Sequence, residues 1–167
     1  HEHIHKWLYR EVDQYGSEIK DGAGNVRAVG RLAFYSRYSK IRSRLEERFR
    51  EICSQSSIEK TKRQLAGVNF VPANRVILVG SVVGGTGSGI LLDTAFLIKD
   101  LKQTKTIENI EQIISIAVLP NVFYPSPADE VSKRSYGNAY AALKELEYYT
   151  LRRNRNGIGG GVDISLD

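Results

Sequence analysis

The sequence of 167 residues contains a single cysteine, Cys53, which excludes a disulfide bond within the chain. It has no uninterrupted apolar stretch long enough to span a bilayer, because its most apolar window, residues 76–98, is broken by glycines, hydroxyl groups and Asp93. Nothing in it resembles a secretory signal peptide. These absences exclude a disulfide-stabilised scaffold and a membrane-spanning helix. They favour a cytoplasmic protein with one domain and a real hydrophobic core.

Negative charge is the scarcer sign: 24 lysine and arginine residues face 19 aspartate and glutamate residues, for a net charge of +5. The excess is concentrated in residues 37–64 and in Arg152, Arg153 and Arg155. Such patches can bind nucleic acid or an acidic partner. A solvated helix face and a helix C-terminus that attracts cations explain the same residues. Because no aromatic residues alternate with the second run, we do not expect nucleic acid as a partner, and we keep it only as an alternative.

Helical periodicity dominates the first half of the chain. Residues 3–19 carry a partial apolar stripe, and a glycine-containing loop over residues 21–27 precedes a long predicted helix over residues 28–54. The apolar residues of the long helix are spaced by four, four and three, which places them on one core-facing side. These residues are Ile41, Leu45, Phe49 and Ile52. Residues 54–74 are polar and end in a proline and asparagine turn, so we expect a surface insertion there.

Two continuous apolar runs in the second half predict strands. The first strand, residues 75–80, leads through a glycine-rich loop into a helix over residues 87–102. The second strand, residues 112–119, leads through a proline-rich loop into a helix over residues 128–149. Short uninterrupted runs are typical of strands buried on both faces of a parallel sheet. The alternation predicts one α/β domain with a mainly parallel sheet flanked by helices.

Ligands of such sheets bind beyond the carboxyl ends of the strands, where residues 81–87, 120–127 and 21–27 are expected to lie. The first of these loops belongs to a run of five glycines within residues 80–89. At the start of a helix the backbone N–H groups have no internal partner and carry the positive end of the helix dipole. A strand, a glycine-rich turn and a helix therefore predict a phosphate site.

Two common phosphate loops are excluded by their spacing. No lysine follows Gly87 or Gly89 at the place that a Walker A loop requires. The glycine spacing is also wrong for a dinucleotide fingerprint, and no acidic residue ends the following strand at the ribose position. A plain structural turn is the remaining alternative, but four glycines with Thr86 and Ser88 in six residues exceed what a turn requires.

Three segments resemble the tubulin/FtsZ superfamily, in family order. Residues 83–89, VGGTGSG, are similar to its phosphate loop, with Val83 in place of the first glycine. Residues 22–33, GAGNVRAVGRLA, look like the segment that lies against the terminal phosphate and opens the next helix. Residues 129–146, DEVSKRSYGNAYAALKEL, resemble the later helix that holds the ribose. The VGS, GGTGSG, LD and GRLA elements resemble most closely the large bacterial tubulin-like proteins.

The resemblance implies a Rossmann-like GTPase-domain fragment that binds GTP or GDP, with Mg²⁺ accompanying the nucleotide. It implies three groups of contacts. The α- and β-phosphates are wrapped by Gly84, Gly85, Thr86, Gly87, Ser88 and Gly89. The γ-phosphate is approached by Gly22, Ala23, Gly24 and Asn25, which a simple turn that caps the following helix explains equally. The ribose is held by Glu130 and Arg134, for which an ordinary i,i+4 surface ion pair is the alternative. Asn138 either faces the base or serves packing.

The resemblance also implies self-association into a filament or oligomer, in which an acidic loop of a neighbouring subunit activates water for hydrolysis. No catalytic residue is identified in this chain, and we expect little turnover by the chain alone. We expect it to be one partial nucleotide-binding domain over residues 1–167, with a tail over residues 151–167 that leads to a second domain. A scaffold that kept the fold and lost the nucleotide is the alternative, favoured by Val83.

Overall fold

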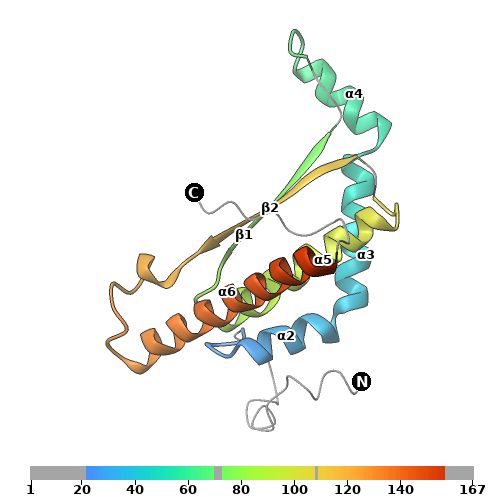
Figure 1. Ribbon diagram of the computed structural model, residues 1–167. Helices are drawn as coiled ribbons and strands as arrows, with labels where there is room; N and C mark the ends of the chain where they lie inside the picture. Colours follow the sequence, from blue (N-terminus) through green and yellow to red (C-terminus); the bar gives the residue numbers. More distant parts are fainter. Residues whose placement is uncertain (1–21, 70–72, 108, 157–167) are drawn as a thin grey trace.

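The computed structural model describes residues 22–69, 73–107 and 109–156 (Figure 1). Its elements, in chain order, are α2 (Arg27–Ser36), α3 (Tyr38–Ile52), α4 (Gln55–Gln64), β1 (Asn74–Ser81), α5 (Gly85–Gln103), β2 (Ile110–Val118), the 3-10 turn η2 (Pro120–Val122) and α6 (Glu130–Asn156). The expected helix over residues 3–19 and the part of the tail after residue 156 lie outside the described residues. The described chain is a mixed α/β fold of five helices and a two-stranded parallel sheet.

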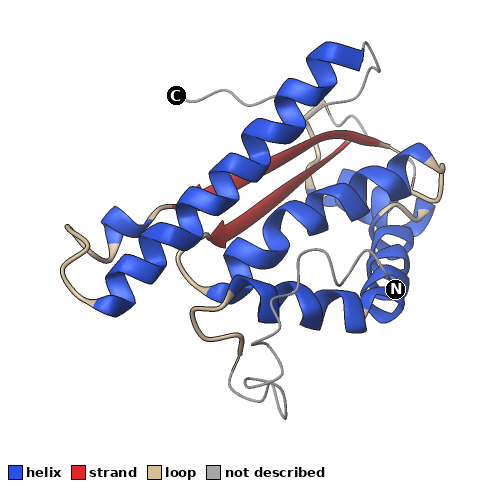
Figure 2. Ribbon diagram, turned by 60° about the horizontal axis from the view of Figure 1, so that its bottom comes forward, coloured by secondary structure: helices blue, strands red, loops and turns tan. Residues whose placement is uncertain are grey.

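The strands β1 and β2 pair in parallel along their whole length, with Val76 opposite Ile113 and Gly80 opposite Ala117. The parallel direction follows from the long crossover through α5, which returns the chain to the same end of the sheet. Helix α5 packs against both strands and also contacts α2 and α6 (Figure 2). The described sheet, which has two strands, is therefore parallel as predicted.

The core lies between α5, the sheet and the first two helices. Its buried residues are Phe34, Leu97, Ile98, Leu101, Ile107 and Ile110. Three of the predicted core positions of the first long helix, Ile41, Leu45 and Phe49, pack against this cluster, as the helical spacing predicted. The prediction for Ile52 is wrong, because 56% of this residue is exposed. Ile52 is the last residue of α3, where the helix has passed beyond the core.

The single helix predicted over residues 28–54 is two helices. Arg37 separates α2 from α3 with φ −114° and ψ 10°, outside the helical region. Phe34 and Tyr38, on either side of the break, pack edge to face with ring centroids 6.0 Å apart. The periodicity of the sequence continues across the break, because both helices bury apolar residues against the same core. Tertiary packing, rather than a local helix-breaking residue, sets the bend.

Residues 54–74 contain a helix of their own. α4 begins after Ser54, whose hydroxyl oxygen accepts a hydrogen bond from the N–H of Ser57 at 3.3 Å, an N-cap interaction. No residue of α4 is buried. The helix projects away from the sheet and its covering helices (Figure 1).

The strands were expected to be buried on both faces, and this expectation is wrong for the described residues. Val76, Leu78 and Ile113 pack toward the core, whereas the residues that alternate with them point to the other face. On that face Ile77 is 57% and Val79 is 69% exposed. A continuous apolar run cannot distinguish a strand covered on two faces from one covered on one, because burial depends on which elements pack against it.

The last helix begins with a reciprocal capping arrangement. The Asp129 carboxylate accepts a hydrogen bond from the N–H of Ser132 at 2.7 Å, and the Ser132 hydroxyl oxygen accepts one from the N–H of Asp129 at 3.0 Å. The two bonds satisfy N–H groups that have no partner within the helix.

This cap predicts a small pH dependence of stability. The hydrogen bonds from Ser132 lower the pKa of Asp129 below its ordinary value. A carboxyl group with a lower pKa in the folded state stabilises the fold above its unfolded pKa, and this contribution is lost as the pH falls through the folded pKa. We expect Asp129→Asn to remove that part of the acid dependence in thermal unfolding measured between about pH 5 and pH 2. An unchanged acid profile in Asp129→Asn would contradict the role of the cap.

Candidate functional site

Two loops meet at the carboxyl end of β1. The strand ends at Ser81, and Gly84 is the N-cap residue of α5, with an extended backbone at φ −90° and ψ 170°. Residues 22–26 lie beside this turn, where the carbonyl of Gly24 accepts a hydrogen bond from the N–H of Gly85 at 2.8 Å. Segments about 60 residues apart in the sequence, both predicted to face the phosphates, are therefore in contact.

Backbone N–H groups are available at the start of α5. Within the part of the chain that the structure describes, the N–H groups of Gly84, Thr86 and Gly87 have no acceptor. The N–H of Gly85 is taken by Gly24, and the N–H of Val83 bonds the Ser81 hydroxyl at 3.3 Å. Thr86 is exposed, and no side chain caps the helix. The arrangement combines unpaired donors with the positive end of a 19-residue helix, which favours an anion.

Different glycines of the loop are required for different physical reasons. A Cβ atom at Gly85 would lie 2.5 Å from the Val26 carbonyl oxygen, and one at Gly89 would lie 2.6 Å from that of Arg27. These two glycines let α2 approach α5 closely. At Gly84, by contrast, the nearest atom to a Cβ would be 3.8 Å away. All four glycines were expected to give an anion access to the backbone, but close backbone packing also explains Gly85, Gly89 and Gly87, where a Cβ would lie 1.9 Å from the Ser81 carbonyl oxygen.

The two hydroxyl residues of the loop face in opposite directions. Ser88 is buried, its hydroxyl donates to the carbonyl of Gly84 at 2.6 Å, and its own carbonyl accepts from Arg27. Thr86 is exposed beside the unpaired N–H groups. Of the two, Thr86 is placed to reach a ligand at the mouth of the loop, whereas Ser88 supports the helix start from within.

The loop over residues 22–26 is a tight turn. Gly22 and Gly24 have φ of +87° and +53°, in the region that favours glycine. The side chain of Ala23 is buried, and its carbonyl accepts from the N–H of Val26 at 3.1 Å. No side chain caps α2. The turn places the backbone of Gly24 and the side chain of Asn25 beside Gly84, so this loop borders the open N–H groups.

A buried ionic cluster joins the helices behind the loops. The guanidinium of Arg31 binds the carboxylate of Asp93 through two contacts of 2.9 Å, and it also binds Glu145 at 3.2 Å. Arg27 binds Glu145 at 2.8 Å and donates to the carbonyl of Ser88. Arg31 belongs to the GRLA element and Asp93 to the LD element of the sequence. These two elements are therefore partners in one ion pair between α2 and α5, with a hydrogen bond from the Arg31 guanidinium to Asp93 at 2.9 Å.

The charges of this cluster depend on each other. Burial raises the pKa of Asp93, and the hydrogen bond and charge of Arg31 offset this in part. Burial lowers the pKa of Arg31, but the hydrogen bond and charge of Asp93 outweigh it, so the pKa lies above its ordinary value. Arg31 thus stays cationic and keeps the buried carboxylate of Asp93 compensated.

The side chain of Asn138 on α6 contacts both loops. Its side-chain N–H₂ donates to the carbonyl of Asn25 at 3.1 Å and to that of Val83 at 2.9 Å. Each acceptor belongs to one of the two loops. The sequence left open whether Asn138 faces a base or serves packing, and the contacts show that it bridges the loops. No local signal identifies this role, because both partners are backbone atoms distant in the sequence.

Glu130 and Arg134 lie in the first turns of α6, N-terminal to Asn138. Glu130 is exposed and pairs with Lys133 at 3.0 Å. Arg134 is also exposed. Among the described residues the structure gives no ion pair between Glu130 and Arg134, so the surface-pair explanation of their spacing is not supported. Their role toward a ribose stays a prediction.

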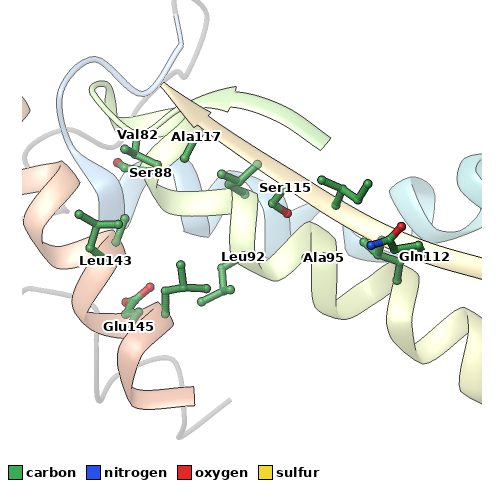
Figure 3. A pocket seen from close by; sticks show the side chains of 14 residues that line it. Val82, Ser88, Leu92, Ala95, Gln112, Ser115, Ala117, Leu143 and Glu145 are labelled. Atoms are coloured by element: carbon green, nitrogen blue, oxygen red, sulfur yellow. The ribbon is translucent and has the colours of Figure 1, made fainter. Parts of the chain in front are cut away.

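A cavity of about 310 Å³ lies between β2, α5 and α6, behind the glycine-rich loop (Figure 3). It reaches from Val82 and Ser88 to Ala95 and Gln112, and Leu143 and other apolar side chains form most of its wall. The one charged residue of its lining is Glu145, whose carboxylate is already paired with Arg27 and Arg31, and no lysine or arginine belongs to the lining. The cavity therefore offers an anion no free cationic side chain.

The fold and the two loops define the class to which this protein belongs. Proteins of this class are α/β domains in which a strand, a glycine-rich loop and a helix follow one another, and the helix start presents unpaired backbone N–H groups at the carboxyl end of a parallel sheet. A family model described as tubulin like matches residues 1–159, and the chain belongs to this tubulin-like family. The family expected from the three motifs is thereby confirmed. No curated protein and no solved structure matches the chain.

Two further findings concern the described residues only. None of their helices is both long and apolar enough to cross a membrane. No three of their histidine, cysteine, aspartate or glutamate side chains are grouped so that they could hold a metal ion.

Proposed function

We propose that this chain is a guanine-nucleotide-binding domain that holds the phosphates of GTP or GDP on the N-terminus of α5. The observation that carries the proposal is the set of unpaired N–H groups of Gly84, Thr86 and Gly87, bordered by the loop over residues 22–26. Membership of the tubulin-like family supports a nucleotide as the anion. On this proposal the two strands belong to the parallel sheet of a Rossmann-like nucleotide-binding domain.

The residues present fit a polyphosphate. Gly84 leaves open space where a side chain would stand, and its N–H and those of Thr86 and Gly87 can donate to phosphate oxygens. Hydrogen bonds to a charged group contribute about 1.5–3 kcal/mol each, so three of them supply a large part of the roughly 8 kcal/mol that a micromolar Kd requires. Residues 81–89 contain no acidic side chain. Bound Mg²⁺ would neutralise phosphate charge, and this loop supplies no carboxylate to hold it.

The function extends to assembly. In the proposed mechanism this chain binds and orients the nucleotide, and the neighbour in a longitudinal filament or oligomer supplies the acidic loop that positions water. The residues described here bind and orient, and none of them is assigned as a catalytic residue. Glu130 and Arg134 are proposed to hold the ribose.

A titration of the purified chain with a fluorescent GTP analogue tests the proposal. We expect saturable binding in the micromolar range, competed by unlabelled GTP, because the donors are preorganised by the helix. Folding is checked by circular dichroism in the same samples. A folded chain with no saturable binding below the millimolar range would instead establish the scaffold that has kept this fold without a nucleotide.

A further inference from the structure

One side chain connects the two loops of the proposed site to a third element. Asn138 is 9% exposed and lies on α6, and its two hydrogen bonds reach carbonyls that are 113 and 55 residues away in the sequence. Both partners, Asn25 and Val83, are acceptors. The orientation of the amide is therefore determined, because only its nitrogen can donate to them.

The bridge complements a second contact between the loops. The N–H of Gly85 bonds the carbonyl of Gly24 at 2.8 Å, which joins the first turn of α5 to the middle of the neighbouring loop. Asn138 joins the positions just beyond, at Asn25 and Val83. Together the two connections define the distance between the edge of the loop over residues 22–26 and the open N–H groups.

We infer that Asn138 is a positioning residue that holds these loops at a fixed separation and thereby sets how strongly a nucleoside triphosphate is preferred over a diphosphate. The inference rests on the proposed function. A diphosphate bound at the N-terminus of α5 contacts the N–H groups of Gly84, Thr86 and Gly87. The loop with Gly24 and Asn25 borders Gly84, so a terminal phosphate that reaches beyond the N–H groups would meet it where Asn138 holds it.

Asn138→Ala tests the inference in the 167-residue chain. We expect the Kd for GTP to rise about tenfold, because one or two hydrogen bonds that position the second loop are lost. The Kd for GDP should change less than about twofold. Asn138→Asp, which keeps the shape but sets a carboxylate against two carbonyl oxygens, should act in the same direction and more strongly.

The matched control is Ser135→Ala, one turn earlier on α6. Ser135 is fully buried, and its hydroxyl donates to the carbonyl of Val131 in the same helix at 2.8 Å. It should leave the ratio of the two Kd values unchanged. A ratio that is also unchanged in Asn138→Ala, an equal weakening of GTP and GDP, or unfolding of both Asn138 variants would overturn the inference.

Failure of the proposed function is distinguishable from failure of the inference. If the wild-type chain binds neither nucleotide, the proposed function is wrong, and the inferred preference for a triphosphate is wrong as well. Whether Asn138 holds the two loops together is then tested by amide hydrogen exchange. We expect Asn138→Ala to accelerate exchange in residues 22–26 and 82–87 together, with no change near Leu101 at the buried end of α5. Unchanged exchange in either loop overturns the bridge itself.

Discussion

Gly84→Asp is expected to abolish nucleotide binding while leaving the fold intact or slightly more stable. Gly84 is the N-cap residue of α5, its extended backbone suits aspartate, and a Cβ atom there meets nothing closer than 3.8 Å. Aspartate at this position accepts hydrogen bonds from the first N–H groups of a helix, and replacing glycine by it adds a few tenths of a kcal/mol. The same carboxylate would occupy the position of a phosphate and repel its negative charge. The substitution should therefore stabilise the fold and weaken nucleotide binding.

The binding loss should be large. Losing two charge-assisted hydrogen bonds costs about 3–6 kcal/mol, which corresponds to at least about a hundredfold rise in Kd for GTP. Titration with fluorescent GTP and thermal unfolding of the same samples measure both effects. Gly84→Asn is the matched control, because it caps the helix without a charge and should lose less affinity. Gly84→Asp that binds GTP like the wild type would show that the phosphate lies elsewhere.

Arg31→Met is expected to destabilise the fold by about 2–3 kcal/mol at neutral pH. Asp93 is 8% exposed, and removing the cation leaves its carboxylate buried without compensation. The expected loss lies below that of a fully buried pair, because the side chains of Arg31 and Glu145 are 18% and 31% exposed. Urea denaturation with an unchanged m-value measures the change.

The pH dependence identifies the mechanism. Burial already raises the pKa of Asp93, and without Arg31 its folded-state pKa lies further above the unfolded value. Such a group stabilises the fold below its unfolded pKa and loses that contribution as the pH rises through the folded pKa. The Arg31→Met variant should therefore recover stability toward acidic pH, and a second change, Asp93→Asn, should restore part of the loss at neutral pH.

Arg42→Met is the matched control for this prediction. Arg42 also pairs with an aspartate of α5, at 2.6 Å, but Asp100 is 48% exposed, so water can replace the cation. We expect a much smaller loss with little pH dependence. Equal losses in the two variants would show that the buried pair has no special role and that the lost packing of the arginine stem dominates.

Local patterns predicted those features of the molecule that depend on neighbours in the sequence. The strand, glycine-rich loop and helix at residues 74–103 are present, and the pairing of β1 with β2 is parallel as the crossover requires. The three motifs also identified the family. The helix break at Arg37 and the exposure of Ile77 were missed, because neither depends on the residue itself or on its immediate neighbours.

The features of the site also separate into those that the local sequence predicts and those that depend on tertiary contacts. A helix start is a local property, so the glycines after the apolar run predicted one nearby, at residue 87, whereas α5 begins two residues earlier, at Gly85 with Gly84 as its N-cap. That Gly85 and Gly89 serve helix packing while Gly84 is open could not be predicted, because the difference depends on how closely α2 approaches α5. The partnership of Arg31 with Asp93 was equally hidden, since 62 residues separate them.

By itself, the sequence determined the order of the two strands and the helix between them, the family, and the glycine-rich turn that precedes that helix, since periodicity and glycine content act over a few residues. Only the tertiary structure decided which side chain bridges the loops, which ion pair is buried and which strand face is covered. These are contacts between distant segments, and their free energies depend on burial that arises when the helices pack together.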